Sequence, residues 1–424
     1  MDANIIVMLI SLTLFLAYIS GMLYTKTGVP DNIWLIGFGI LFGPITRIFN
    51  FSALSELIPF VVLMALNLLM FEAGLNVDLK TFRESMRKSG YLGLITYIIT
   101  IFVVGNALAY FMPQTFTLTE GFLFGAMIGG TSTSTVLSLL GCIGLNSNDL
   151  GECKLFLVLE SIFTDSLSIV TTMTLLRILQ MPGIPLSEGF KDIVFVLMVG
   201  SLVGFGIGVL WVQVLDFARN RPFNYIMTLA ILFVCYFVGE QLGGPGAGAL
   251  SGLVFGVTMT NYPLLARRFN LKENVRVERR RLRAFHEEIT FLIKSFMFFF
   301  VGLQLNLSLP LFAVGLGIAT LLGALRYLSV YVTSYFTELS EVEVKVARLE
   351  FSNGLTALVL AQLPYLVEGT GFFTDTGIYL DLIVPIVITT ALFGALVGPL
   401  IYQDKIQILP EMEVESIDEG LKKE

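Results

Sequence analysis

Long apolar runs recur along the whole chain, separated by short polar segments. Each run is roughly long enough to cross ~30 Å of hydrocarbon as a helix that rises ~1.5 Å per residue. Such a pattern predicts an all-α polytopic membrane protein, a single transporter-sized domain over residues 1–424 that ends in a short tail at 403–424. About thirteen spans are expected, at 4–24, 31–46, 54–76, 91–112, 119–142, 154–178, 192–215, 224–241, 246–260, 287–306, 309–335, 344–366 and 379–402.

Composition and charge support this prediction. The chain is 55% apolar and only 14% charged. If the N-terminus lies outside and the C-terminus in the cytoplasm, most Lys and Arg residues fall in cytoplasmic loops, including the basic run at 267–283, as multi-pass proteins of the cell membrane require. We expect this basic run to contact anionic lipid headgroups. The net charge of −7 argues against a nucleic-acid partner.

Two pairs of internal matches suggest an inverted repeat. The segment "FEAGLNVDL" (71–79) resembles "FFVGLQLNL" (299–307), and "GILFG" (39–43) resembles "GLVFG" (252–256). Both pairs are seven spans apart, so their members cross the membrane in opposite directions, as an inverted-topology repeat demands. We therefore predict a first repeat at about 1–178 and a second at about 224–402. Chance similarity between Gly- and Leu-rich helices is the alternative.

Two spans at the same offset contain residues that are poor at holding a helix. The fifth carries "GGTSTST" (129–135) and the twelfth carries "FSNGLTAL" (351–358). Non-helical backbone at that depth is tolerable only where it lines a cavity or is buried in protein. Its carbonyls and hydroxyls could then coordinate an ion, so we predict discontinuous helices around a substrate site. Ordinary Gly/Ser/Thr helix packing is the alternative.

Asp165 lies about halfway along the sixth span. A carboxylate at the bilayer centre costs at least about 2.5–3.5 kcal/mol, which makes it a functional candidate. A proton and a metal cation can compete for such an acceptor. Ser161 and Thr164 would supply hard oxygen ligands for Na⁺ or K⁺ beside it. An aspartate locked in a structural ion pair between helices is the alternative.

The remaining buried charges need partners. Glu160 precedes Asp165 by five residues, about 140° around the helix, so it points elsewhere. Lys294, near mid-depth of the tenth span, is its expected partner, and direct neutralisation of the empty site is the rival role. Glu72 in the third span is either a snorkelling surface residue or a cation ligand. His286 lies where the basic loop meets the tenth span, and pH sensing there is one possibility.

These motifs, in this order, resemble the monovalent cation:proton antiporter superfamily, specifically its sodium/proton exchanger branch. The resemblance rests on "GILFGP", "FEAGL", "GGTSTST", "LESIFTD", "FFFVGL" and "NGLTALVLAQLP" and covers nearly the whole chain. It implies that Asp165 carries cation and proton, that Ser161 and Glu160 match family positions, and that Thr131 and its neighbour Ser132 supply oxygens from an unwound helix. It also implies a mobile core and a homodimer.

Three positions depart from the family pattern. The usual Asn-Asp or Asp-Asp pair of the sixth span is Thr164-Asp165 here, and a Thr-Asp-Pro of the fifth span is replaced by 131–133, Thr-Ser-Thr. The usual Arg-Gly of the twelfth span is Asn353-Gly354, which removes the common partner of the glutamate at 160 and favours Lys294 as its substitute. A single carrier carboxylate makes electroneutral exchange the simplest stoichiometry.

We therefore predict a secondary transporter, not an enzyme and without a cofactor, that exchanges Na⁺, or Li⁺ or K⁺, for protons by alternating access. A cation-coupled symporter for an organic solute, or a cation channel on the same fold, is the alternative. An intramembrane aspartyl protease would need a Gly-x-Gly-Asp stretch, and dinucleotide or ATP binding would need motifs that the sequence lacks.

Overall fold

The computed structural model describes residues 3–49, 58–77, 79–143, 145, 147–180, 186–217, 224–269, 279–366, 373, 375–397 and 400. Within these ranges the chain is helical and contains no strand. The predicted tail at 403–424, and the middle of the predicted basic run, lie outside them. The helices, including two π-helical turns, are α1 (Ala3–Thr27), α2 (Asp31–Ile40), η1 (Leu41–Ile45), α3 (Ile58–Asn76), α4 (Leu79–Phe111), α5 (Leu118–Met127), α6 (Thr133–Cys142), α7 (Ser147–Gln180), α8 (Leu186–Phe217), α9 (Asn224–Gly243), α10 (Ala247–Phe269), α11 (Arg279–Gln304), α12 (Leu309–Phe336), α13 (Glu341–Leu349), α14 (Leu355–Leu360), α15 (Leu363–Leu366), α16 (Gly377–Leu392) and η4 (Phe393–Val397).

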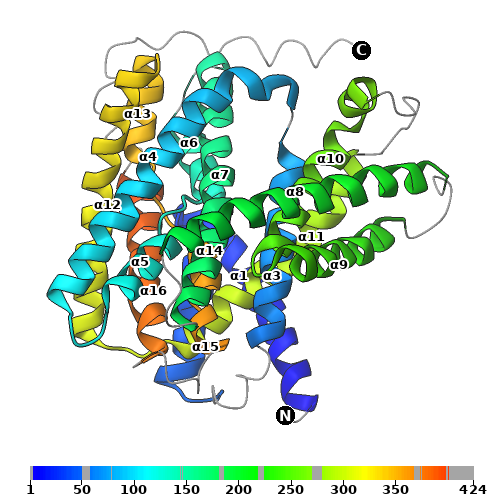
Figure 1. Ribbon diagram of the computed structural model, residues 1–424. Coiled ribbons are helices and arrows are strands. Elements are labelled where there is room, and N and C mark those ends of the chain that lie inside the picture. Colours follow the sequence, from blue (N-terminus) through cyan, green and yellow to red (C-terminus); the bar gives the residue numbers. More distant parts are fainter. Residues whose placement is uncertain are drawn as a thin grey trace, which may run out of the picture.

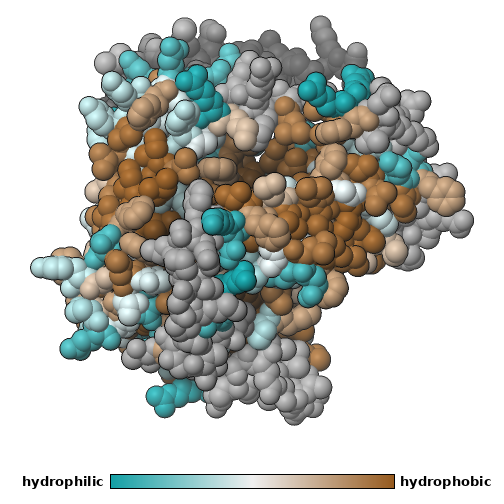
Figure 2. Space-filling model, viewed as in Figure 1, coloured by the Kyte–Doolittle hydropathy of each residue, from teal (hydrophilic) through white to brown (hydrophobic). Residues whose placement is uncertain are grey.

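The all-α polytopic fold predicted from the apolar runs is confirmed. Within the described residues, each predicted span coincides with a helix or with a helix that contains a break, and the count of thirteen membrane spans stays a prediction. Eight of the helices in the described residues are long and apolar enough to cross a membrane by length and composition. Figure 2 shows apolar side chains across the middle of one face and hydrophilic ones toward its upper edge, as expected of a protein surrounded by lipid.

The two predicted helix breaks are also confirmed. The fifth span divides into α5 and α6, which are separated by non-helical backbone at 128–132, and the twelfth divides into α13 and α14, separated at 350–354. Gly129-Gly130 and Asn353-Gly354 lie inside these breaks. Short polar side chains hydrogen-bond nearby backbone groups in place of the helical bonds, and glycine loses the most backbone entropy in a helix. The chain therefore unwinds at two places deep in the protein.

Glycines bring the proposed repeats together in two similar contacts. A Cβ on Gly39 of α2 would stand 2.2 Å from the carbonyl oxygen of Phe299 and 2.7 Å from the Cα of Gly302, both in α11. A Cβ on Gly256 of α10 would stand 2.6 Å from the carbonyl oxygen of Phe71 in α3. The contact of "GILFG" in α2 with "FFVGLQLNL" in α11 is thus repeated by their two matches, since "GLVFG" in α10 packs on "FEAGLNVDL" in α3. Paired contacts of this kind support an inverted repeat, whose boundaries stay a prediction.

The helices that carry the chemistry lie at the centre of the molecule. Helix α7 packs against α4, α5 and α6, and α12 packs against α4, α13 and α16. Figure 1 shows α12 and α13 on one side, α8, α9 and α10 on the other, and α6, α7 and α14 between them. Glu160 on α7 and Arg326 on α12 are therefore surrounded by protein rather than by lipid.

Candidate functional site

The two unwound segments cross and are hydrogen-bonded to each other. The backbone N–H of Ser132 donates to the carbonyl oxygen of Ser352 at 2.8 Å. The side-chain amide of Asn353 donates to the carbonyl oxygens of Ile128 at 2.7 Å and Gly130 at 2.8 Å. Backbone groups freed by the helix breaks are in this way satisfied inside the protein, as membrane depth requires. The side chain of Asn353 therefore joins the second break to the first.

Two hydroxyl residues of α7 hold the first unwound segment. The hydroxyl of Ser161 donates to the carbonyl oxygen of Thr131 at 2.6 Å and lies 2.8 Å from the hydroxyl oxygen of Thr133. The hydroxyl of Thr164 accepts from the N–H of Thr131 at 3.3 Å and donates to the carbonyl of Ser161 at 3.1 Å. Ser161, Thr164 and Thr131 were all predicted site residues, and the structure brings them together. Ser132 instead bonds Ser352 and approaches Ser134.

Asp165 faces this crossing from α7. A Cβ added to Gly130 would stand 2.9 Å from Oδ1 of Asp165 and 3.1 Å from the Ser168 hydroxyl, so the carboxylate lies against bare backbone. The Thr356 hydroxyl, at the start of α14, hydrogen-bonds Asp165. The buried hydroxyl oxygen of Thr131 has no hydrogen-bond partner among the described residues. The Asp165 carboxylate lies at the first break, and the Thr356 hydroxyl that acts on it comes from just after the second; both are oxygen donors suited to a hard monovalent cation.

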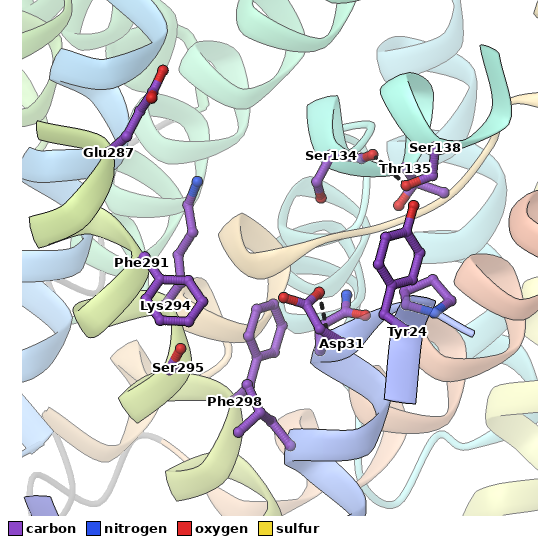
Figure 3. Close-up of a pocket in the computed structure, with 13 residues that line it drawn as sticks. Tyr24, Asp31, Ser134, Thr135, Ser138, Glu287, Phe291, Lys294, Ser295 and Phe298 are labelled. Atoms are coloured by element: carbon purple, nitrogen blue, oxygen red, sulfur yellow. Dashed lines mark hydrogen bonds between the residues drawn. The ribbon is translucent and has the colours of Figure 1, made fainter. Parts of the chain in front are cut away.

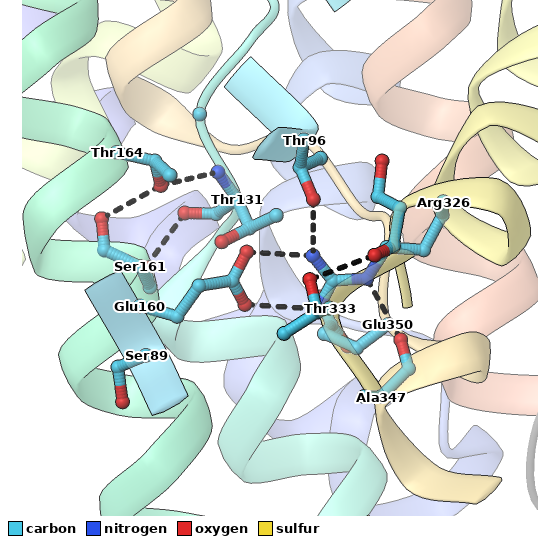
Figure 4. Close-up of polar contacts among 12 residues, drawn as sticks. Ser89, Thr96, Thr131, Glu160, Ser161, Thr164, Arg326, Thr333, Ala347 and Glu350 are labelled. Carbon is cyan, nitrogen blue, oxygen red and sulfur yellow. Dashed lines mark hydrogen bonds and ion pairs between the residues drawn. The ribbon is translucent and has the colours of Figure 1, made fainter. Parts of the chain in front are cut away.

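Glu160 pairs with Arg326 of α12, not with Lys294. Arg326 donates to both carboxylate oxygens of Glu160, at 2.6 Å and 2.9 Å, and both side chains are fully buried. Further donors of Arg326 reach the carbonyl oxygen of Ala347 at 2.7 Å and the hydroxyl of Thr96 at 3.4 Å (Figure 4). The predicted Glu160–Lys294 pair is therefore wrong. The planar guanidinium offers two parallel N–H donors to the two carboxylate oxygens, a fixed geometry that the compact ammonium group of a lysine lacks.

Lys294 binds Glu72 instead. Its Nζ lies 2.9 Å and 3.2 Å from the two carboxylate oxygens of Glu72, and about a third of the lysine side chain, 34%, is exposed. A role for Lys294 in partly neutralising Asp165 stays a prediction, in keeping with its electrostatic influence on that carboxylate. Glu72 meets a cation of the protein itself, so no described contact supports it as a ligand of the transported ion.

A cavity of about 300 Å³ lies beside Lys294. It is found where α1 ends and α2 begins, beside the middle of α11, and α6 forms another part of its wall. Figure 3 shows Lys294 and Glu287 on one side of it and the hydroxyls of Ser134 and Ser138 on the other. Asp165 is not part of its lining. The cavity therefore provides a polar approach from one end of the molecule toward the second half of the broken fifth span.

His286 is buried near the beginning of α11 rather than exposed at an interface. Its ring packs edge-on against Phe71, with 4.5 Å between ring centroids. Neither ring nitrogen has a hydrogen-bond partner among the described residues. The observed contacts are those of an aromatic core residue, and a role in pH sensing stays a prediction.

Sequence reasoning missed three residues of this region: Arg326, Thr356 and Glu350. Arg326 had the clearest signal, because it stands inside a long apolar helix where an arginine is costly. Thr356 follows the second helix break by two residues, as Thr133 follows the first by one. Glu350 begins the second break and is fully buried, although it directly follows α13, a helix with several charged residues.

Comparison with known proteins places these features in context. The sodium/hydrogen exchanger transmembrane family matches residues 11–403. The chain is 24% identical to the Na⁺/H⁺ antiporter NhaH of Halobacillus aidingensis over 80% of this chain and 84% of that protein. It is 27% identical to the K⁺/H⁺ antiporter NhaP2 of Shewanella oneidensis over 57% of this chain and 42% of that protein.

A solved structure has a similar fold. The sodium proton antiporter MjNhaP1 from Methanocaldococcus jannaschii superposes with a TM-score of 0.79 at 19% identity, over 97% of this chain and 100% of that one. At this identity the likeness concerns the fold, and it extends over nearly all of the chain.

Proposed function

This chain belongs to the sodium/hydrogen exchanger family, and we propose that it exchanges a monovalent cation for protons across a membrane, with Asp165 as the carrier. Relatives named as Na⁺/H⁺ and K⁺/H⁺ antiporters support cation/proton exchange as its activity. They also leave Na⁺, K⁺ and Li⁺ as candidate ions, of which we propose Na⁺. The protein acts as a transporter in this proposal, not as an enzyme.

One observation carries the assignment of Asp165. Its carboxylate lies against Gly130, in the unwound part of the fifth span, while Thr356 from the second broken span bonds it. A single acceptor between two broken helices binds a cation when ionised and a proton when the cation leaves. Thr131, Ser161 and Thr164 hold the first break beside it. Movement of this core relative to the other helices would expose Asp165 to each side in turn.

The setting of this exchange follows from the same premises. We propose a multi-pass protein of the cell membrane, with the N-terminus outside and the C-terminus in the cytoplasm, because this orientation places most basic residues inside. In this orientation the cavity beside Lys294 lies on the cytoplasmic side, since Tyr24 near the end of α1 lines it. A homodimer is the assembly that we expect in the membrane.

Purified protein in liposomes that contain a pH-sensitive dye tests this function. Wild-type protein should move protons when Na⁺, K⁺ or Li⁺ is added outside, and Asp165→Asn should abolish that movement. Asp192→Asn serves as the control, because Asp192 pairs with Arg177 at the partly exposed ends of α7 and α8. Undiminished cation-driven proton flux in Asp165→Asn would overturn the carrier role. Solute uptake without proton flux would point to a symporter.

A further inference from the structure

Glu350 is a buried carboxyl group to which the exchange reaction at Asp165 gives no role. It ends α13 and begins the second unwound segment, and it is fully buried. One oxygen, Oε1, accepts from the hydroxyl and the backbone N–H of Ser352. The other, Oε2, has no hydrogen-bond partner among the described residues. An ionised carboxylate with a bare oxygen inside protein is strongly disfavoured.

The charges around Glu350 do not compensate a second carboxylate. Arg326 of α12 and Glu160 of α7 are the charged groups that act on it. Arg326 already gives two hydrogen bonds to Glu160 and a third to Ala347. One guanidinium between two carboxylates would leave a net negative charge in a region without exposed surface. A neutral Glu350, with a proton on its carboxyl, removes that charge.

The bare oxygen lies close to the wall of the cavity. A Cβ added to Gly394 of η4 would stand 4.0 Å from Oε2 of Glu350 and 2.9 Å from the methyl carbon of Thr135. Thr135 of α6 lines the cavity beside Lys294. Neither Gly394 nor Thr135 carries a charge, so no described group on this side competes for a proton. Gly394 and Thr135 therefore connect the surroundings of Oε2 to the wall of the cavity.

We propose that Glu350 is a second proton-binding site of this protein, which holds a proton in the conformation described here and exchanges it with the cavity past Thr135. The site is separate from Asp165, and the inference does not depend on cation exchange. Glu350 is three residues from Asn353, whose amide joins the two unwound segments. The charge at the crossing of the broken helices thus depends on the pH of the solution in the cavity.

Infrared spectroscopy of the full-length protein in lipid tests this directly, because a protonated carboxyl has its own C=O stretching band. With ¹³C-carboxyl glutamate incorporated, wild-type protein at neutral pH should show an isotope-shifted acid band that is converted to carboxylate bands at alkaline pH. Glu350→Gln should lose the shifted band. Glu343→Gln is the matched control and should keep it, since Glu343 is a buried glutamate that Lys88 already neutralises.

Two further measurements keep the test decisive. Asp165→Asn should retain the shifted band, which separates Glu350 from the proposed carrier. If Glu350→Gln does not fold, the labelled wild-type protein still tests the proposal, because it must show the isotope-shifted acid band at neutral pH. The absence of any isotope-shifted acid band in wild-type protein at neutral pH, or its survival in folded Glu350→Gln, would overturn the proposal.

Discussion

Glu160 and Arg326 stand 166 residues apart in the chain and form a two-bond ion pair with no exposed surface on either side chain. The pair joins α7, which carries Asp165, to α12. Because Arg326 also binds Ala347 near the end of α13, it reaches from the helix of the carrier to the beginning of the second break. The position of Asp165 and the position of that break are therefore mechanically linked through one side chain.

Removing Arg326 should destabilise the protein strongly. Arg326→Met leaves the Glu160 carboxylate buried without a partner, which costs about 3–5 kcal/mol for pairs of this kind. The double variant Glu160→Gln/Arg326→Met should recover part of that loss, since no charge is then left unpaired. Thermal unfolding of the wild type, the two single variants Glu160→Gln and Arg326→Met, and the double variant in detergent measures the coupling between the two side chains. Additive losses in the double variant would show that the two groups do not interact.

Asn353→Ala should loosen the contact between the two breaks. The carbonyl oxygens of Ile128 and Gly130 lose their donor, and an unsatisfied buried polar group costs about 1–3 kcal/mol. We expect a lower unfolding temperature together with slower exchange in liposomes. Asn106→Ala is the matched control, because the amide of Asn106 is exposed on α4 and bonds only its own helix. Equal effects of the two variants would argue against a special role for Asn353.

Gly130→Ala should abolish exchange while the protein still folds. Its methyl group would stand 2.9 Å from the Asp165 carboxylate and 3.1 Å from the Ser168 hydroxyl, so it would occupy the space where a cation must approach. Gly141→Ala in α6 meets no atom within 4 Å and should have no effect. Proton flux and size-exclusion profiles of both variants separate blocked binding from misfolding. Normal flux in Gly130→Ala would place the ion elsewhere.

Lys294→Gln should strengthen cation binding, by roughly three- to tenfold in apparent affinity. The substitution removes a positive charge that acts on Asp165 and frees the carboxylate of Glu72. Stability should change little, because the pair is partly exposed. The cation concentration that gives half-maximal proton flux measures the effect, with Lys191→Gln on the surface of α8 as control. A weaker or unchanged affinity would contradict it.

Helix positions and breaks could be predicted from the sequence because each depends on local composition. Apolar length marks a span, and Gly130 or Asn353 marks a place where a helix is weak. The partner of Glu160 depends instead on which helices are neighbours and on how each is rotated. Lys294 and Arg326 both lie deep in apolar spans, and only the packing of α12 on α4 beside α7 decides between them. The depth of a residue in the membrane can be inferred from a sequence of this kind, whereas the direction in which it faces around the helix axis cannot.

The two ion pairs of the core should respond differently to ionic strength. Where solvent reaches them, dissolved salt screens charges that are farther apart than about 8–10 Å at physiological concentrations and about 3 Å at 1 M salt. Lys294 lines the cavity, and both Lys294 and Glu72 are partly exposed, so concentrated Na⁺ or K⁺ solutions weaken their attraction. Glu160 and Arg326 are sealed from solvent and keep theirs. The salt that the transporter handles can therefore loosen the lining of its cavity while the joint between α7 and α12 stays intact.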